Sequence, residues 1–263
     1  MNNTLHNGLQ VLEFLADTAE AVSVKEVAAY FQLPNSHICR LLKSLAEAGY
    51  VEQLPGSRKY RVSLKILNLA NARLKKEHLL GIARPYMRQL AEKVDGAVFV
   101  TRIYCGYSLI IGTEYPALFP EIHETVVGAL HSPTSSACGK VCAAYAPEEI
   151  RSALLAEIAW AAPGDFQDRP EDFEKELAVI RQQGWARRYI PGAVNAVGVP
   201  LFEKNGVLNG ALGVMLPPQR DLTQDLWQTV IESALSCGKL ISYAQGCPVE
   251  VYPGKYCTIK EEK

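Results

Sequence analysis

The sequence SVKEVAAYFQLPNSHICRLLKSLAEAGYVEQLPGSRKYRVSL, residues 23–64, decides the fold of the N-terminal part of the chain. Ser23 followed three residues later by Glu26 is a capping box, which predicts a helix over residues 23–31. The tripeptide Leu-Pro-Asn interrupts that helix. A second helix is expected over residues 36–49, with the glycine as its C-terminal stop. The two helices and their tight connection form a helix-turn-helix pattern.

The second predicted helix is expected to be buried on one side only. Ile38, Leu41, Leu42 and Leu45 recur at helical spacing and mark the buried side. The opposite side carries hydrogen-bond donors, which a helix needs to read the major groove of DNA. The residues that we expect to contact DNA from the helices are Lys25, Ser36, His37, Arg40, Lys43 and Ser44.

A basic hairpin follows the second helix. Residues 50–54 and 59–63 alternate in polarity around a Pro-Gly-Ser-Arg turn, as the strands of a β-hairpin do. Arg58 lies in the turn, and Lys59 and Arg61 share the polar face, so all three are expected to bind phosphate. A cationic hairpin beside a recognition helix is typical of a winged helix-turn-helix domain. The alternative is a structural helical hairpin with a solvated polar face, and the basic hairpin favours DNA binding over it.

The charge is distributed unevenly along the 263 residues. Residues 1–80 hold ten Lys and Arg against seven Asp and Glu, whereas the remainder holds seventeen against twenty-one. A mildly basic first part on an acidic second part indicates that nucleic-acid contact is confined to the first part. Because the positive excess is small, we expect two copies of this part to act together on DNA.

We expect an α+β fold with two domains and a connecting helix. The expected division is a winged helix-turn-helix domain over 1–63, a linker helix over 64–84, an effector-binding domain over 85–246 and a C-terminal tail over 247–263. The linker is expected to be one helix to about residue 80, and a further helix is expected to begin at Pro85. The apolar stripe Ile66, Leu67, Leu69, Ala70 and Leu74 can pack on a second copy or on the chain's own second domain.

Composition and motifs exclude several classes of protein. The seven cysteines are irregularly spaced, and the chain shows neither a signal peptide nor an apolar run long enough for a membrane span, so a cytoplasmic protein without membrane contact is expected. No phosphate loop, dinucleotide fingerprint or nucleophile elbow is present, so neither an enzyme nor a cofactor is expected. A thiol hydrolase using Cys138 with His123 or His131 is the remaining enzymatic alternative.

Three blocks of sequence together resemble the isocitrate lyase regulator (IclR) family of bacterial transcription factors. They are LPNSHICRLLKSLAEAGYVEQLPGSRKYRVS at 33–63, HSPTSSACGKVCAAYAPEE at 131–149 and GVPLFEKNGVLNGALGVMLPP at 198–218. The resemblance implies a GAF-like C-terminal domain that binds a small-molecule effector. It also implies a homodimer or homotetramer on a palindromic operator in double-stranded DNA.

The run Ser135–Gly139 is a candidate effector site. Its residues are small and lie where a helix begins, so unpaired amides and the helix dipole favour a carboxylate or phosphate there; ordinary close packing is an equal alternative. The effector-binding residues that the resemblance implies or adjoins are Val126, Leu130, Ser136, Ala137, Cys138, Asn195, Ala196, Gly213 and Met215. Many members of the family carry polar cysteine or serine side chains at the last few of these positions. Their replacement here favours a larger, more apolar or aromatic organic acid.

Cysteine chemistry is the alternative to an organic-acid receptor. Cys138 and Cys142 share one helix face, and a helix N-terminus lowers the pKa of a thiol. A redox-sensitive or metal-responsive regulator that uses Cys138 and Cys142 is therefore the rival interpretation, although the spacing matches no standard zinc pattern. Buried, inert cysteines are the commonest outcome.

Overall fold

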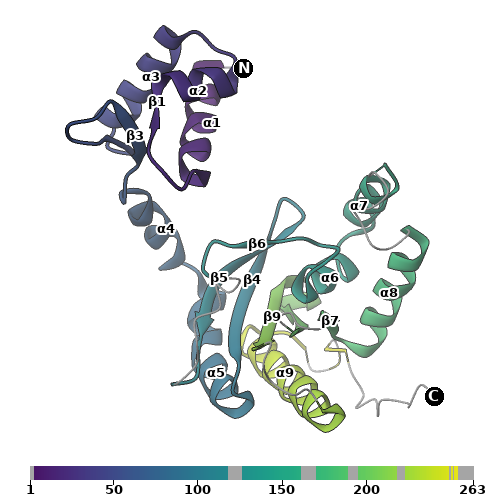
Figure 1. Ribbon diagram of the computed structural model, residues 1–263. Helices are drawn as coiled ribbons and strands as arrows, with labels where there is room; N and C mark the ends of the chain where they lie inside the picture. Colours follow the sequence, from purple (N-terminus) through teal and green to yellow (C-terminus); the bar gives the residue numbers. More distant parts are fainter. Residues whose placement is uncertain are drawn as a thin grey trace. The chain divides into compact units, whose positions relative to one another are not determined.

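The computed structural model describes residues 3–117, 126–160, 170–188, 195–217, 223–248, 250 and 252–253. The chain divides into two compact units, Met1–Glu77 and His78–Lys263 (Figure 1). The division falls inside the segment 64–84 that was expected to link the two domains. No helix among the described residues is long and apolar enough to cross a membrane.

The N-terminal unit combines four helices with a small antiparallel sheet. Its elements are α1 (Asn3–Asp17), β1 (Val22–Ser23), α2 (Val24–Phe31), α3 (Asn35–Glu47), β2 (Val51–Gln53), β3 (Lys59–Val62) and α4 (Ile66–Leu74). The strand order is β1-β3-β2, so β1, which lies just before α2 in the sequence, pairs with β3 as a third strand beside the β2–β3 hairpin. This is the predicted winged helix-turn-helix arrangement.

Local sequence signals explain how the first helices begin and end. The Ser23 side chain accepts a hydrogen bond from the Glu26 amide, and the Ser23 amide donates to the Glu26 carboxylate at 2.7 Å, so the predicted capping box is confirmed. Gln32, with φ of 53°, ends α2 in a left-handed conformation. The helix α3 begins one residue earlier and ends two residues earlier than predicted, because its last turn tightens before Gly49.

The C-terminal unit contains a six-stranded antiparallel sheet. Its elements are α5 (His78–Val94), β4 (Ala97–Tyr104), β5 (Tyr107–Glu114), β6 (Leu130–His131), α6 (Ala137–Ala144), α7 (Glu148–Trp160), α8 (Pro170–Gln183), β7 (Ala186–Arg188), β8 (Asn195–Phe202), the 3-10 helix η2 (Lys204–Gly206), β9 (Leu208–Leu216) and α9 (Gln224–Ala244). The strand order is β6-β5-β4-β9-β8-β7. The long strands β4, β5, β8 and β9 are rich in Val, Ile and Leu, whereas the edge strands β6 and β7 are only two and three residues long. The expected α+β class is confirmed.

Helices cover both faces of this sheet. The helices α5 and α9 pack against each other and on one face, and α6 packs on the other face with α8 behind it (Figure 1). Neighbouring residues of β8 show the two sides, because Gly198 lies against Ala137 of α6 whereas Val199 lies against Gly238 of α9. The core on the α6 side joins the sheet to α6 and α8.

The connecting segment differs from the prediction in two ways. The expected helix over 64–80 is wrong in its second half, because α4 ends at Leu74 and α5 begins at His78. Burial changes at this break: α4 has no buried residue, whereas Leu79 is only 1% exposed. The helix expected to begin at Pro85 is also wrong in its start, because Pro85 lies inside α5. Residues on both sides of Pro85 are buried against the sheet, and this packing keeps the helix continuous where the local rule predicts a start.

Two residues of the expected tail pack on the C-terminal unit. Cys247 is buried, and the Tyr252 hydroxyl donates a hydrogen bond to the Pro200 carbonyl oxygen at 3.0 Å. Burial raises the pKa of the Tyr252 hydroxyl well above its ordinary value. The chain just after α9 is therefore held against the end of β8 rather than extending away from the unit.

Candidate functional site

The helix α3 has the two-sided character that the sequence indicates. Ile38, Leu41 and Leu42 are buried in the core of the N-terminal unit. On the helices, Lys25, Ser36, Arg40, Lys43 and Ser44 are exposed, and His37 is half-buried. The structure thus leaves the polar side of α3 open while its apolar side holds α3 in place.

A residue of α1 that the sequence did not single out contacts this polar side. The Asn7 side-chain amide lies 3.4 Å from His37 Nε2. The other ring nitrogen, His37 Nδ1, lies 3.5 Å from the guanidinium of Arg40. His37 therefore lies between Asn7 of α1 and Arg40 on the polar side of α3, and the ring nitrogen that carries no proton accepts a hydrogen bond from one of them.

The three basic residues of the hairpin are exposed but not equivalent. Arg61 lies directly opposite Glu52 in the β2–β3 register, and its Nε is 2.6 Å from the Glu52 carboxylate. Among the described residues, neither Arg58 nor Lys59 makes an ion pair with an acidic side chain. The charge of Arg61 is thus compensated, and the cationic character of the hairpin comes mainly from Arg58 and Lys59.

Lys65 joins the hairpin to the end of α3. Its ammonium group donates to the Ala48 carbonyl oxygen at 2.5 Å and lies 4.7 Å from the centre of the Tyr50 ring. A cation at a helix C-terminus also offsets the negative end of the helix dipole. Sequence reasoning did not identify this residue, because the contact joins positions 17 residues apart.

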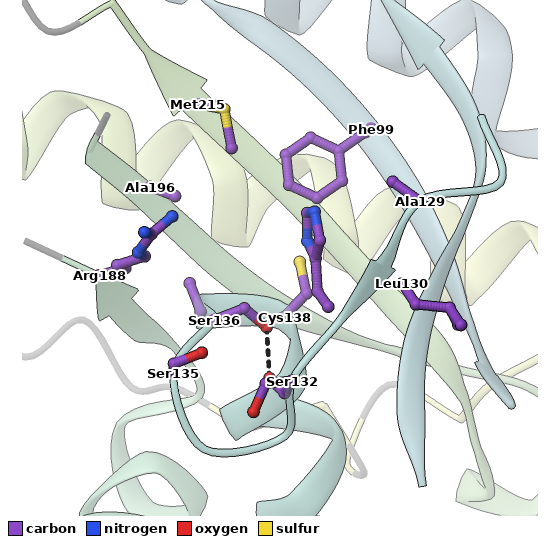
Figure 2. Close-up of a pocket in the computed structure, with 12 residues that line it drawn as sticks. Phe99, Ala129, Leu130, Ser132, Ser135, Ser136, Cys138, Arg188, Ala196 and Met215 are labelled. Carbon is purple, nitrogen blue, oxygen red and sulfur yellow. Dashed lines mark hydrogen bonds between the residues drawn. The ribbon is translucent and has the colours of Figure 1, made fainter. Parts of the chain in front are cut away.

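A cavity of about 450 Å³ lies in the C-terminal unit between the sheet and the start of α6 (Figure 2). Strands contribute Phe99, Leu130, His131, Arg188, Ala196 and Met215 to its lining. The segment leading to β6, the turn before α6 and α6 itself contribute Ala129, Ser132, Ser135, Ser136, Ala137 and Cys138.

The strand register builds the floor of the cavity. Arg188 is paired with Ala196, and Ala196 is paired with Met215, so the three side chains stand in one row on the same face. The Phe99 ring closes the floor, because it lies across Gly213 on the neighbouring strand. A Cβ atom at Gly213 would lie 2.2 Å from this ring, so only glycine permits the Phe99 orientation seen here.

The start of α6 forms the opposite wall. The Ser136 hydroxyl accepts a hydrogen bond from the Gly139 amide at 2.9 Å and donates to the Ser132 carbonyl oxygen at 2.8 Å (Figure 2). Ser136 is therefore the N-cap of α6, as the small-residue run indicated. The peptide between Ala137 and Cys138 rests on the sheet at Gly198, where a Cβ atom would lie 2.7 Å from the Ala137 carbonyl carbon.

The cavity brings together six of the nine residues predicted for an effector site: Leu130, Ser136, Ala137, Cys138, Ala196 and Met215. The lining does not include Val126, Asn195 or Gly213. Val126 is 53% exposed before β6, Asn195 precedes Ala196 and so faces the other side of the sheet, and Gly213 is covered by Phe99. Sequence reasoning missed Phe99, Ala129, Ser132 and Arg188 as lining residues, named Ser135 only within the run of small residues, and considered His131 only beside the thiols.

The expectation of a lowered thiol pKa is wrong. Cys138 and Cys142 are buried, and burial raises the pKa of Cys138 well above its ordinary value and that of Cys142 to about 12. At neutral pH both thiols are therefore protonated and poorly nucleophilic. Within the described ranges, no group of three or more His, Cys, Asp or Glu side chains is arranged to hold a metal ion.

Two family models match most of the chain. The model "Bacterial transcriptional regulator IclR C-terminal" matches residues 71–243, and the model "IclR helix-turn-helix domain" matches residues 4–55. Among curated proteins, the glycerol operon regulatory protein of Streptomyces griseus is 26% identical over 221 residues, which cover 82% of this chain and 85% of that protein.

Solved structures share the fold. An IclR family transcriptional regulator from Brucella abortus superposes with a TM-score of 0.76 at 22% identity, covering 93% of each chain. An IclR homolog from Microbacterium hydrocarbonoxydans, crystallised in complex with 4-hydroxybenzoate, superposes with a TM-score of 0.73 at 20% identity, covering 92% of this chain and 99% of that one.

Proposed function

Since the chain belongs to the IclR family of bacterial transcriptional regulators, we propose that its affinity for an operator is controlled by an organic acid bound in the C-terminal cavity. The observation that carries the regulatory part is this cavity of about 450 Å³, which is lined by the start of α6 and lies in the unit distinct from the helix-turn-helix. The family is one of transcriptional regulators, and we propose neither a catalytic role nor a cofactor.

The DNA-binding surface is the exposed side of α3 together with the hairpin. Arg40 and Lys43 face the major groove, and Ser36, His37 and Ser44 are candidate readers of base edges, because all five lie on the side of α3 away from the core. Lys25 on α2, Arg58 and Lys59 are assigned to phosphate, with Arg61 in a lesser role because it pairs with Glu52. Binding to the chromosome would place the protein in the cytoplasm.

The regulator is proposed to act as a homodimer or homotetramer on a palindromic site. Two N-terminal units, called heads below, add their contacts on one duplex, which a head with a small positive excess needs. The helix α4 supports this proposal, because Leu67 and Leu69 are 53% and 56% exposed and no residue of α4 is buried in its own unit. Such apolar side chains are the proposed seam between subunits.

The effector is proposed to be a small carboxylic acid of apolar or aromatic character. Ala137 and Cys138 supply backbone amides at the positive end of the α6 dipole, and Leu130 and Met215 supply apolar surface. The 4-hydroxybenzoate in the Microbacterium hydrocarbonoxydans homolog belongs to this chemical class. Binding changes DNA affinity only if the acid has different affinities for two arrangements of the heads.

Titration of operator DNA with and without acids tests this function. The protein should bind DNA from the region upstream of its own gene, and at least one aliphatic or aromatic acid should change its affinity for that DNA. Ala137→Leu fills the cavity and should abolish the response while leaving the affinity without ligand intact. A response that survives Ala137→Leu would contradict the effector site. DNA affinity that depends on diamide or a chelator would favour the thiol or metal alternative.

A further inference from the structure

Among the described residues that line the C-terminal cavity, one side chain carries a permanent charge. Of its described lining residues, Arg188 is a permanent cation, and no Asp or Glu is among them. The other side chains are apolar, hydroxyl-bearing or, at His131, an imidazole. A guanidinium stays protonated at all physiological pH values and pairs with a carboxylate through two parallel hydrogen bonds. The charge of the described lining residues therefore favours an anion.

The strand pairing turns Arg188 into the cavity. Arg188 stands opposite Ala196, which also lines the cavity, and paired residues of an antiparallel sheet project on the same side. The preceding residue, Arg187, stands opposite Val197 on the other side and is exposed. The chain thus holds two adjacent arginines on one edge strand, of which one faces the cavity and the other does not.

The polar and apolar parts of the lining are separated. Figure 2 shows Arg188 beside Ala196 and on the same side as Ser135, whereas Phe99, Ala129 and Leu130 lie across the cavity. The Phe99 ring meets the His131 ring edge to face, with 5.9 Å between centroids, so the far wall is aromatic. A ligand that spans the cavity meets a cation at one end and a flat, largely apolar surface with the His131 imidazole at the other.

We infer that Arg188 determines the specificity of the cavity for monocarboxylic acids with a flat or extended apolar body. The carboxylate lies between Arg188 and the N-terminus of α6, and the apolar body lies against Phe99 and Met215. Among the described lining residues, the far wall offers a second carboxylate only the His131 imidazole and no permanent cation, so dicarboxylic acids bind less tightly than monocarboxylic acids. This inference rests on the proposed function, since it names the chemistry of the same effector site.

Matched ligands measure the charge preference directly. Calorimetry on the full-length chain would compare benzoate with benzamide and terephthalate, and hexanoate with hexanamide and adipate. At least one monocarboxylate should bind at least tenfold more tightly than its amide and its dicarboxylate. Equal affinity for acid and amide, tighter binding of a dicarboxylate, or no binding of either monocarboxylate would overturn the inference.

The two arginines provide matched variants. Arg188→Gln should weaken binding of the monocarboxylate about ten- to a hundredfold, the range expected for losing a charged hydrogen-bond partner. Arg187→Gln removes the same charge from the other side of the strand and should leave the affinity unchanged. Arg188→Glu should lose the acid and prefer benzylamine. Equal losses in Arg187→Gln and Arg188→Gln would show a long-range charge effect and refute the assignment.

Further measurements separate this inference from the proposed function. Thermal unfolding of each variant establishes that it is folded, and the acid-against-amide comparison in the unmodified chain needs no variant. If an acid binds through Arg188 but leaves operator affinity unchanged, the specificity assignment stands and the regulatory function fails. If operator affinity responds equally to acids and amides, the regulatory function stands and Arg188 is not its determinant.

Discussion

The hairpin offers a quantitative test of the DNA-binding surface. Arg58 is exposed and makes no ion pair with a described acidic residue, whereas Arg61 is paired with Glu52 at 2.6 Å. Arg58→Gln should therefore remove one phosphate contact per bound head. Glu52→Gln should have the opposite effect, because it releases Arg61 for phosphate.

The expected magnitude follows from counterion release. Each lost contact should reduce the slope of log affinity against log salt by about 0.9 per head, which at 0.15 M salt corresponds to roughly a fivefold loss of affinity. Glu52→Gln should steepen the slope by up to about the same amount. Both changes in slope should double when two heads bind one duplex.

Fluorescence anisotropy with a labelled duplex between 50 and 300 mM KCl measures both slopes, and it needs no knowledge of the operator, because phosphate contacts are independent of sequence. Thermal unfolding checks that each variant keeps its fold. An unchanged slope in Arg58→Gln would refute the phosphate role of the hairpin. Weaker binding by Glu52→Gln would show that the ion pair supports the hairpin conformation rather than restraining Arg61.

Four further outcomes are expected. Arg40→Ala should cost about 1–3 kcal/mol of operator affinity and relax specificity at one base pair, as measured by competition with singly substituted duplexes. Gly198→Val should lower the free energy of unfolding in urea by about 1–3 kcal/mol, because its side chain would collide with the backbone at the start of α6. Leu67→Asp should shift the oligomer towards monomer in sedimentation experiments, since that side chain is 53% exposed on α4. Because burial raises the pKa of Cys142 to about 12 and that of Cys138 well above its ordinary value, both should react slowly with a disulfide reagent at pH 8 and gain reactivity only as the pH rises far above that.

The fold was largely predictable because its signals are local. The Ser23–Glu26 capping box, the spacing of Ile38, Leu41 and Leu42 along α3, and the alternation of polarity in the β2–β3 hairpin are each contained in a few consecutive residues. Such patterns predict an element from short-range hydrogen bonds and from which face is apolar. The small residues at the start of α6 likewise predicted a helix N-terminus at Ser136, although not the space beside it.

The features that determine which side chains are available to DNA or to a ligand depend on contacts between distant parts of the chain. Pro85 predicts a helix start, and only packing against the sheet shows that α5 runs through it. The neutralisation of Arg61 depends on the register that places Glu52 opposite it. Arg187 and Arg188 are indistinguishable as letters, and pairing with β8 alone turns one of them into the cavity. Local sequence determines which element forms because backbone preferences act within a turn or a strand, whereas the direction in which a side chain faces depends on the neighbouring strand, which tertiary structure alone supplies.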